Sequence, residues 1–477
     1  MSSLPPVIMW FRGDLRLADN PALVAACEGD RPVIPLFILD DSHDLRPLGG
    51  ASRWWLDKSL RSLARGLAAL GAKLVLRRGN ALEVLRSMIS ASGASAVFWN
   101  RLYDPQTVAR DRALKDALTG SGIECHSFNG SLLSEPWEIR TATGGPFKVF
   151  SAFWRTAGPQ AGREAPLQVP ARITRFENDA ESDLIETWGL HPSSPDWSQG
   201  FSTWEPGETG AQARLDLFLQ QNIDGYGHRR DQPGQEGTSR LSPHLHFGEI
   251  GPRQIWAACD GAVERGAPQG DVATFQKELG WREFNQHLLF NFPATATSNL
   301  DSRFDSFPWR KNHRGLAAWR RGRTGFPIVD AGMRQLWSTG WMHNRVRMIA
   351  ASFLIKDLLV NWRVGEDWFW DTLVDADVAN NVGGWQWVAG SGADAAPYFR
   401  VFNPVLQGQK FDPGGDYVRR WIPELSRLPN ASIHAPWLAD RDVLAAAGVD
   451  LGRTYPAPIV DHARARERAL ALFQGLS

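Results

Sequence analysis

Short runs of consecutive apolar residues recur through the first part of the chain. They occupy residues 7–11, 33–39, 73–76 and 96–99, with a weaker run at 123–128. Between them, apolar residues recur at the spacing of an amphipathic helix, over residues 54–70, 82–92 and 107–119. Strands that are apolar throughout and alternate with helices predict a parallel sheet that is covered on both faces. Ligands of such sheets bind beyond the carboxyl ends of the strands.

After the last of these runs the pattern changes. Residues 131–206 are rich in Pro, Gly, Ser and Asp, and they predict a long connector. From residue 207 onward, helical patterns separated by Gly and Pro continue almost to the end. We therefore expect an α/β domain over residues 1–130, a connector over 131–206 and a larger all-helical domain over 207–477.

Composition narrows the class of protein. An apolar fraction of 43% and a charged fraction of 22% are those of a globular protein. The three cysteines, Cys27, Cys125 and Cys259, lie far apart, which excludes a disulfide framework and indicates a reducing compartment, the cytoplasm. We see no signal peptide and no apolar run of the ~20 residues that a membrane helix needs. Lys and Arg total 52, as do Asp and Glu, so nucleic acid binding would need a local patch.

Tryptophan is in excess, with 22 residues against 5 tyrosines. Nine of these tryptophans lie between positions 309 and 387. Because the indole is redox-active and stacks on planar rings, this excess indicates a flat cofactor or a nucleobase. The alternative is a large helical core that uses tryptophan as filler.

Two segments carry polar groups in a helical context. Residues 237–243 (Gly-Thr-Ser-Arg-Leu-Ser-Pro) predict a helix N-terminus, which is either a plain cap or an anion site suited to a pyrophosphate. On a helix, one face would carry Glu278, Trp281, Arg282 and Asn285. Such a face would suit a cavity that stacks a ring and hydrogen-bonds its edge. The alternative is a solvated face with a salt bridge between Glu278 and Arg282.

Two further polar segments lie in the helical part. Asn344, Arg347 and Met348 share one helical face, and His343 is expected to be structural. Residues 375–387 combine two acids, two amides and a Gly-Gly step before two tryptophans. The Gly-x-Glu ending of a calcium loop is missing there, so we expect no metal.

Taken in order, these motifs resemble the photolyase/cryptochrome family, and the resemblance spans nearly the whole chain. It begins at residues 10–17 (Trp-Phe-Arg-Gly-Asp-Leu-Arg-Leu), is densest from residues 324–330 (Thr-Gly-Phe-Pro-Ile-Val-Asp) to Asn403-Pro404, and ends at residues 455–460. The resemblance implies a Rossmann-like α/β domain, a long connector and a C-terminal helical domain that binds FAD and DNA. This organisation agrees with the one derived from periodicity.

The resemblance implies a flavin site built from residues that match the family's motifs. Arg347 and Asp375 would form an ion pair against the isoalloxazine, and Asn381 would face flavin N5. Asp377 would lie close to the flavin ring or its ribityl chain. The residues implied to hold the FAD phosphates, or otherwise to contact the cofactor, are Tyr226, Thr238, Ser239, Arg240, Leu241, Ser242 and Trp341.

The resemblance also implies a lesion pocket and an electron relay. Glu278, Asn344 and Met348 would line the pocket. Trp281 and Trp387 would sandwich a flipped-out pyrimidine dimer. The residues implied to contact the substrate DNA are Arg230, Arg282, Asn285, Arg345 and Gln407. The relay from flavin to surface would run through Trp385, Trp362 and Trp309.

The lesion type follows from the same helix. Enzymes for (6-4) lesions carry two histidines where this chain has Asn344 and Met348, so the resemblance implies repair of cyclobutane pyrimidine dimers. The chain also resembles the bacterial class III photolyases, which are relatives of plant cryptochromes. The implied enzyme is a deoxyribodipyrimidine photo-lyase, a monomer on damaged DNA with no membrane association. It would transfer an electron from excited FADH⁻ to the dimer. The alternatives are a blue-light receptor cryptochrome without repair activity and a photolyase-like protein for single-stranded DNA. The intact set of pocket residues, and an end at Ser477 without a signalling tail, favour the enzyme.

The antenna chromophore is the least defined feature. In the enteric-type folate site an Asn-Glu pair follows the fourth strand, whereas this chain has Gln106-Thr107 there. Relatives of class III bind methenyltetrahydrofolate in a different pose, so we expect methenyltetrahydrofolate as the second chromophore, bound in another manner.

Overall fold

The computed structural model describes residues 4–177, 180–395 and 399–476. The chain divides into two compact units. The first unit comprises Met1–Trp197, Trp204–Gln221 and Ser239–Pro293, and the second comprises Ser198–Thr203, Asn222–Thr238 and Ala294–Ser477. Each unit is described by itself.

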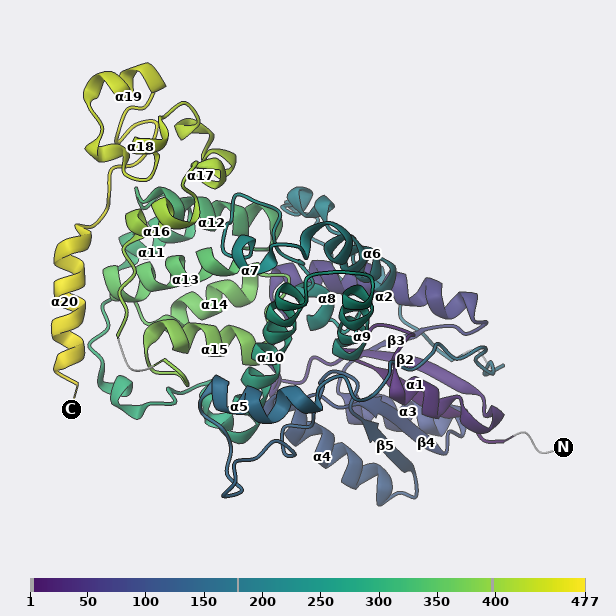
Figure 1. The fold of residues 1–477 in the computed structure, drawn as a ribbon. Helices are drawn as coiled ribbons and strands as arrows, with labels where there is room; N and C mark the ends of the chain where they lie inside the picture. The colour runs from purple at the N-terminus through teal and green to yellow at the C-terminus, as the bar shows by residue number, and fades with distance from the viewer. Residues whose placement is uncertain (1–3, 178–179, 396–398, 477) are drawn as a thin grey trace. The chain divides into compact units, whose positions relative to one another are not determined.

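The first unit contains a five-stranded parallel sheet in the order β3-β2-β1-β4-β5 (Figure 1). Its strands are β1 (Val7–Phe11), β2 (Val33–Leu39), β3 (Val75–Arg78), β4 (Ala96–Asn100) and β5 (Glu124–Phe128). The predicted α/β class and all five strands are confirmed. Every residue of the central strands β1 and β4 is buried. Strands that are buried on both faces favour apolar residues at every position, which explains the uninterrupted apolar runs in the sequence.

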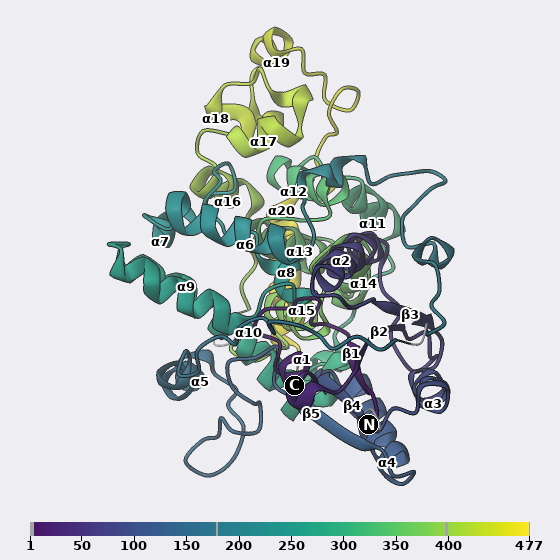
Figure 2. The same ribbon diagram turned by 90° about the vertical axis from the view of Figure 1, so that its right-hand side faces the viewer.

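Nine helices belong to the described part of the first unit. They are α1 (Pro21–Ala26), α2 (Gly50–Ala69), α3 (Ala81–Ser92), α4 (Pro105–Thr119), α5 (Phe150–Ala157), α6 (Glu208–Leu217), α8 (Ser242–His246), α9 (Pro252–Glu264) and α10 (Gln269–Asn291). Polar side chains start several of them: Asn80 caps α3 and Asp104 caps α4. Leu85 of α3 and Leu114 of α4 share one core with Trp10 of β1. Figure 2 shows α3 and α4 next to the strands of the sheet.

The second unit is helical in the part that the structure describes. Its helices are α7 (Tyr226–Arg229), α11 (His313–Arg320), α12 (Pro327–Thr339), α13 (Asn344–Ser352), α14 (Trp362–Thr372), α15 (Val378–Ala389), α16 (Pro404–Phe411), α17 (Asp416–Trp421), α18 (Asn430–Ile433), α19 (Arg441–Ala447) and α20 (His462–Gln474). A π-helical turn, Phe353–Asp357, follows α13. Helices α12, α13, α14, α15 and α17 share one hydrophobic core. The core includes Trp319, Trp362 and Trp385. The predicted helical character is confirmed.

A buried carboxylate holds the start of α12. Asp330 accepts hydrogen bonds from the backbone N–H groups of Thr324 (2.6 Å) and Gly325 (3.0 Å) and from the Tyr455 hydroxyl (2.7 Å). Burial raises the pKa of Asp330, and the hydrogen bonds oppose that rise. The network ties the C-terminal segment to the helix that leads toward Trp341.

Candidate functional site

The second unit holds a bidentate ion pair between α13 and the segment before α15. Arg347 Nη1 and Nη2 lie 3.1 and 2.8 Å from Asp375 Oδ1 and Oδ2, and Arg347 Nε donates to the Met342 carbonyl at 2.7 Å. A guanidinium that is held at three nitrogens has a fixed plane. The expected ion pair is present, and its plane could support a flat ring.

Asp377 and Asn381 lie at the start of α15. The Asp377 carboxylate caps the helix by accepting from the Asn380 N–H at 2.9 Å and from the Asn380 amide at 2.6 Å. Asn381, one residue later, donates from Nδ2 to Glu366 Oε1 at 2.6 Å and to the Glu366 carbonyl at 3.2 Å. The Asn381 amide is therefore oriented, and its oxygen remains as an acceptor.

Sequence reasoning missed Glu366. This residue lies on α14 and is 5% exposed. No local spacing signal could have identified it, because its relation to Asn381 arises only when α14 packs on α15.

The beginning of α13 is capped by His343. Its Nδ1 accepts from the Arg345 N–H at 3.2 Å, and burial lowers the His343 pKa to about 4. The imidazole is therefore neutral near pH 7, as a structural cap requires, and the predicted structural role is supported. Asn344 is exposed and Met348 is half-buried.

Three of the predicted DNA contacts are linked within the second unit. Arg345 Nη2 lies 2.9 Å from Asp231 Oδ1, which follows Arg230 directly. The Arg345 guanidinium also covers the ring of Phe411 at 4.5 Å, and Phe411 ends α16, the helix that carries Gln407. These contacts bring Arg230, Arg345 and α16 into one area.

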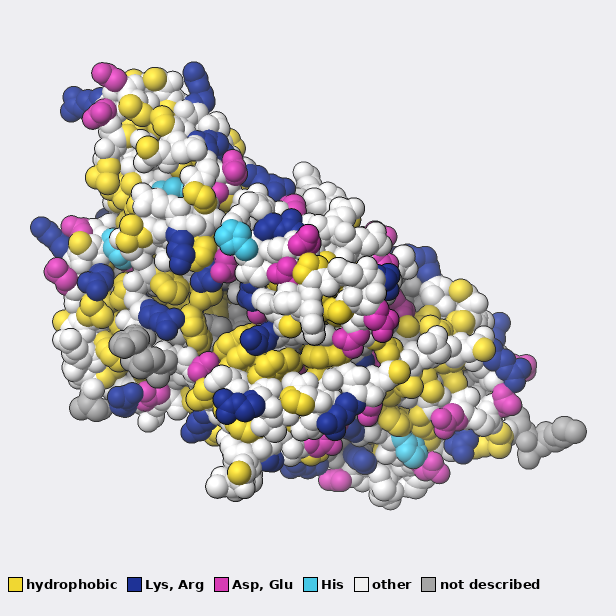
Figure 3. Space-filling view, viewed as in Figure 1, with side chains coloured by type: hydrophobic (Ala, Val, Ile, Leu, Met, Phe, Trp, Pro, Cys, Tyr) yellow, Lys and Arg dark blue, Asp and Glu magenta, His cyan; other side chains and the backbone are white. Residues whose placement is uncertain are grey.

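Basic and acidic residues are equal in number in this chain, at 52 each. Figure 3 shows acidic side chains interspersed with the basic ones on the face in view. Any attraction for phosphates must therefore depend on local groups such as Arg345 rather than on the whole surface.

Trp385 lies in the core of the second unit and is 2% exposed. A Cβ at Gly365 would lie 2.2 Å from its ring, so the indole rests directly on the backbone of α14, one turn after Trp362. Phe369 and Trp319 meet the same ring edge-on, with centroid separations of 5.0 and 6.2 Å. Trp319 was not among the residues predicted for the relay.

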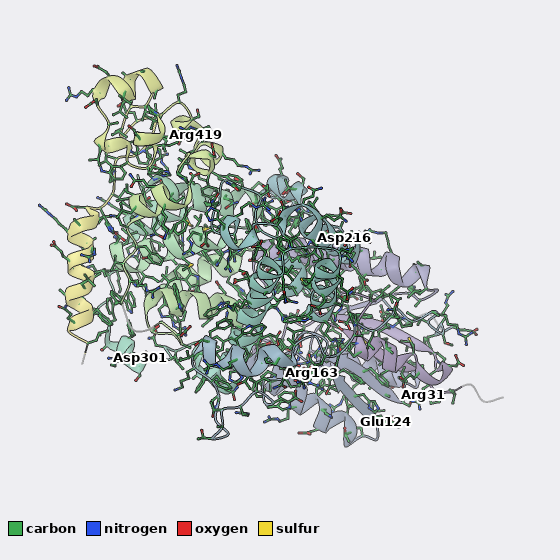
Figure 4. All side chains as sticks on the ribbon, in the orientation of Figure 1. Arg31, Glu124, Arg163, Asp216, Asp301 and Arg419 are labelled. Carbon is green, nitrogen blue, oxygen red and sulfur yellow. The ribbon has the colours of Figure 1, made fainter. Side chains whose placement is uncertain are left out.

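Trp362 and Trp309 lie in the same unit. Trp362 Nε1 donates to Asn299 Oδ1 at 2.9 Å. Asp301, labelled in Figure 4, caps the 3-10 turn that leads to Trp309, which is half-buried and packs on Phe307 at 4.4 Å. The three predicted relay residues thus run from full burial at Trp385 to partial exposure at Trp309.

The segment predicted to hold phosphates is irregular. The helix N-terminus predicted within residues 237–243 is present, because α8 begins at Ser242. Its N-cap is Leu241, without a side-chain hydrogen bond there, so neither Thr238 nor a serine caps the helix. Arg240 has a positive φ of 54°, which turns the backbone sharply before the helix. Thr238 belongs to the second unit, whereas Ser239 to Ser242 belong to the first. Tyr226 is buried at the start of α7.

The polar face of α10 lies in the first unit. Its four predicted residues, Glu278, Trp281, Arg282 and Asn285, are all half-buried. Arg282 Nη1 donates to the Ser131 carbonyl at 2.7 Å and lies 3.4 Å from Glu283 Oε1, so this guanidinium anchors the chain after β5. A contact of Arg282 with DNA remains a prediction.

Glu283 itself was missed by sequence reasoning. Its Oε2 accepts from the Leu133 N–H at 2.9 Å and from the Ser134 N–H at 3.4 Å. Burial raises the pKa of Glu283 to about 7, although Arg282 opposes the rise.

The positions of the enteric-type folate pair serve local structure. Gln106 Oε1 accepts from the Arg46 N–H at 3.1 Å, and the Thr107 N–H donates to the capping carboxylate of Asp104 at 3.0 Å. Neither residue is an acid, which matches the expected departure from that site.

Two observations concern the whole described chain. Over the described residues, no helix is both long and apolar enough to cross a membrane. Within the same residues, no three His, Cys, Asp or Glu side chains gather as a metal site would require.

Comparison with known proteins defines the family. Residues 7–171 match the family model described as DNA photolyase, and residues 275–475 match the FAD binding domain of DNA photolyase. The chain is 53% identical to a deoxyribodipyrimidine photo-lyase of Agrobacterium fabrum, over 98% of this chain and 97% of the relative. It is 41% identical to cryptochrome-1 of Arabidopsis thaliana, over 96% of this chain and 69% of the relative.

The fold agrees with these matches. The crystal structure of a bacterial class III photolyase from Agrobacterium tumefaciens superposes with a TM-score of 0.97 at 52% identity, covering 100% of this chain and 98% of that one. The chain therefore belongs to the photolyase/cryptochrome family and is an enzyme of the photolyase type with an FAD-binding domain.

Proposed function

We propose that this enzyme repairs cyclobutane pyrimidine dimers in DNA with the energy of light. Bound FAD in its fully reduced form would supply an electron on excitation and recover it after the dimer has split. The observation that carries the proposal is the fixed set formed by the Arg347–Asp375 pair and the oriented Asn381 amide. A planar ion pair and an oriented amide acceptor, both in the second unit, fit a flavin ring, which needs a flat support and a partner at N5.

The chain's own residues would bind the lesion and orient it. Trp281 and Trp387 would stack on the flipped-out bases, which offsets part of the unstacking cost, at about 1–3 kcal/mol per stacked base. Asn344 and Met348, in place of two histidines, favour a cyclobutane dimer over a (6-4) lesion. Arg230, Arg345 and Gln407 would hold the phosphates and bases around it. Trp281 and Trp387 belong to different compact units, so their sandwich is part of the proposal.

Three further features belong to the proposal. Methenyltetrahydrofolate would serve as antenna, bound otherwise than in the enteric-type site. The enzyme would act as a monomer on damaged DNA in the cytoplasm. The functional division would follow residues 1–130, 131–206 and 207–477.

A lesion assay tests the proposal. Reduced protein is mixed with duplex or single-stranded oligonucleotides that contain either a cyclobutane thymine dimer or a (6-4) lesion, and the products are separated after illumination or darkness. We expect light-dependent recovery of thymines from the cyclobutane dimer alone. Repair confined to single strands would support the single-strand alternative. Repair of neither lesion would favour the receptor alternative, which the similarity to cryptochrome-1 keeps open.

A further inference from the structure

Phe150 lies face to face with Trp281. The ring centroids of Phe150 and Trp281 are 3.8 Å apart, and their planes differ by 9°. Phe150 opens α5, within the segment that the sequence predicts as a connector, and it is 7% exposed. At this distance Phe150 covers one face of the indole.

The approach of α5 to α10 depends on Gly280. A Cβ at Gly280 would lie 2.5 Å from the Trp154 ring, so a larger residue would displace α5. Trp154 follows Phe150 by one helical turn, and its ring is nearly parallel to that of Phe150, at 6.2 Å and 11°. Gly280, the residue before Trp281, thereby determines how closely the Phe150 ring approaches the Trp281 ring.

Phe284 packs against the edge of this stack. It meets Phe150 edge-on at 5.8 Å and 71°, and it meets Trp281 edge-on at 5.9 Å and 76°. Phe284 is 1% exposed. Among the ring contacts of the described residues, Phe150 is the partner that stacks on Trp281. Because Phe150 covers one face of the indole, a ligand ring could stack only on the opposite face.

We propose that Phe150 is a positioning residue that backs Trp281 and makes its indole a rigid platform for a base of the lesion. This inference rests on the proposed function. A platform that is already ordered loses less conformational freedom when a ligand stacks on it, so its rigidity strengthens binding without any contact to the substrate. The connector thus contributes to lesion recognition.

The test compares three variants in a binding assay. Phe150→Leu removes the aromatic face while keeping apolar volume, and Phe150→Tyr keeps an aromatic ring at this position. Phe153→Leu is the matched control, because Phe153 is on the same helix but packs on Phe284 and His287. We measure the Kd for dimer-containing and undamaged duplexes, and the repair yield at saturating DNA.

We expect Phe150→Leu to weaken dimer binding roughly three- to ten-fold, the range for loss of an aromatic pair. Its repair yield at saturation and its affinity for undamaged DNA should not change. Phe150→Tyr and Phe153→Leu should both bind the dimer-containing duplex with the affinity of wild type. In a Trp281→Ala background, Phe150→Leu should have no further effect, since its role acts through Trp281.

Two outcomes would overturn the inference: Phe150→Leu that binds the dimer as tightly as wild type, or an equal loss with and without Trp281. If the wild-type protein bound dimer-containing and undamaged duplexes with the same Kd, the proposed function itself would be refuted. Failure of this inference and failure of the proposed function are therefore distinguishable.

Discussion

Asn381 Nδ2 lies 2.6 Å from Glu366 Oε1, so a buried carboxylate on α14 determines which way the Asn381 amide points. With the nitrogen engaged, the oxygen is left to accept a hydrogen bond. An acceptor suits a flavin N5 that carries a hydrogen, and a neutral one adds no negative charge beside a reduced flavin.

The first prediction concerns this amide. Asn381→Ser should retain FAD, because a smaller polar group leaves the phosphate contacts untouched. If Asn381 faces N5, the reduced protein should be reoxidised by air in the dark several-fold faster than wild type, because the shorter serine side chain would no longer reach N5. Time-resolved absorption measures the rate. Equal rates would mean that Asn381 does not face N5.

Glu366 should act through the same amide. In Glu366→Gln the side chain can either accept from the Asn381 amide or donate to it, so only the backbone carbonyl of residue 366 still requires the Asn381 nitrogen. We therefore expect reoxidation between the wild-type and Asn381→Ser rates, with no further change when both substitutions are combined. Additive rates in the double variant would show that Glu366 acts separately.

The relay prediction uses Trp385, whose ring rests on Gly365. Trp385→Phe should keep FAD and keep dimer repair by enzyme that was reduced beforehand. Photoreduction of the oxidised protein should slow by at least ten-fold, because the first electron hop is removed. Trp319→Phe, which alters a neighbouring ring, is the control. Photoreduction of Trp385→Phe at the wild-type rate would assign the first hop to another tryptophan, such as Trp341 or Trp387.

Glu278 is expected to form a hydrogen bond with the polar edge of a lesion base. Glu278→Ala should lower the repair yield at saturating DNA several-fold with little loss of FAD, whereas Glu278→Gln, which keeps a polar group of the same size, should keep more of the yield. Flavin absorption and product separation measure the two quantities. A Glu278→Ala yield equal to that of wild type would remove Glu278 from the lesion pocket.

Glu283 predicts a pH dependence of stability. Its pKa is raised from 4.5 to about 7 in the folded protein, so the folded state retains a proton that the unfolded state loses between these values. Stability from this group is full below pH 4.5 and falls as pH rises to about 7, by on the order of 3 kcal/mol. Glu283→Gln should flatten the fall of the thermal midpoint over this window. Parallel profiles for variant and wild type would contradict the assignment.

Local patterns were enough to predict the sheet. Runs such as residues 33–39 are apolar throughout because β2 is almost wholly buried, and this signal does not depend on the rest of the chain. The six residues of α1 are too few to show a helical period, so that helix was missed. The start of α8 lies within the segment predicted for it, but the sequence did not reveal that the sharp turn at Arg240 places Leu241 at the N-cap.

Some residues of the candidate site could be predicted from the sequence, and others could not. Arg347 and Asp375 could be named from motifs, and they pair as expected. Glu366 and Phe150 could not, because their roles depend on helices that meet only in the folded chain. Phe150 in particular lies in a segment whose sequence pattern indicates only a connector.

The most direct test of the central claim is turnover. Dimer-containing oligonucleotide is supplied in large excess over reduced enzyme without further reductant, and the return of thymine absorption is followed in the light and in the dark. If each electron returns after a dimer splits, many dimers should be repaired per enzyme molecule, in the light only. Repair that stops at one dimer per enzyme, or that proceeds equally in the dark, would contradict the account.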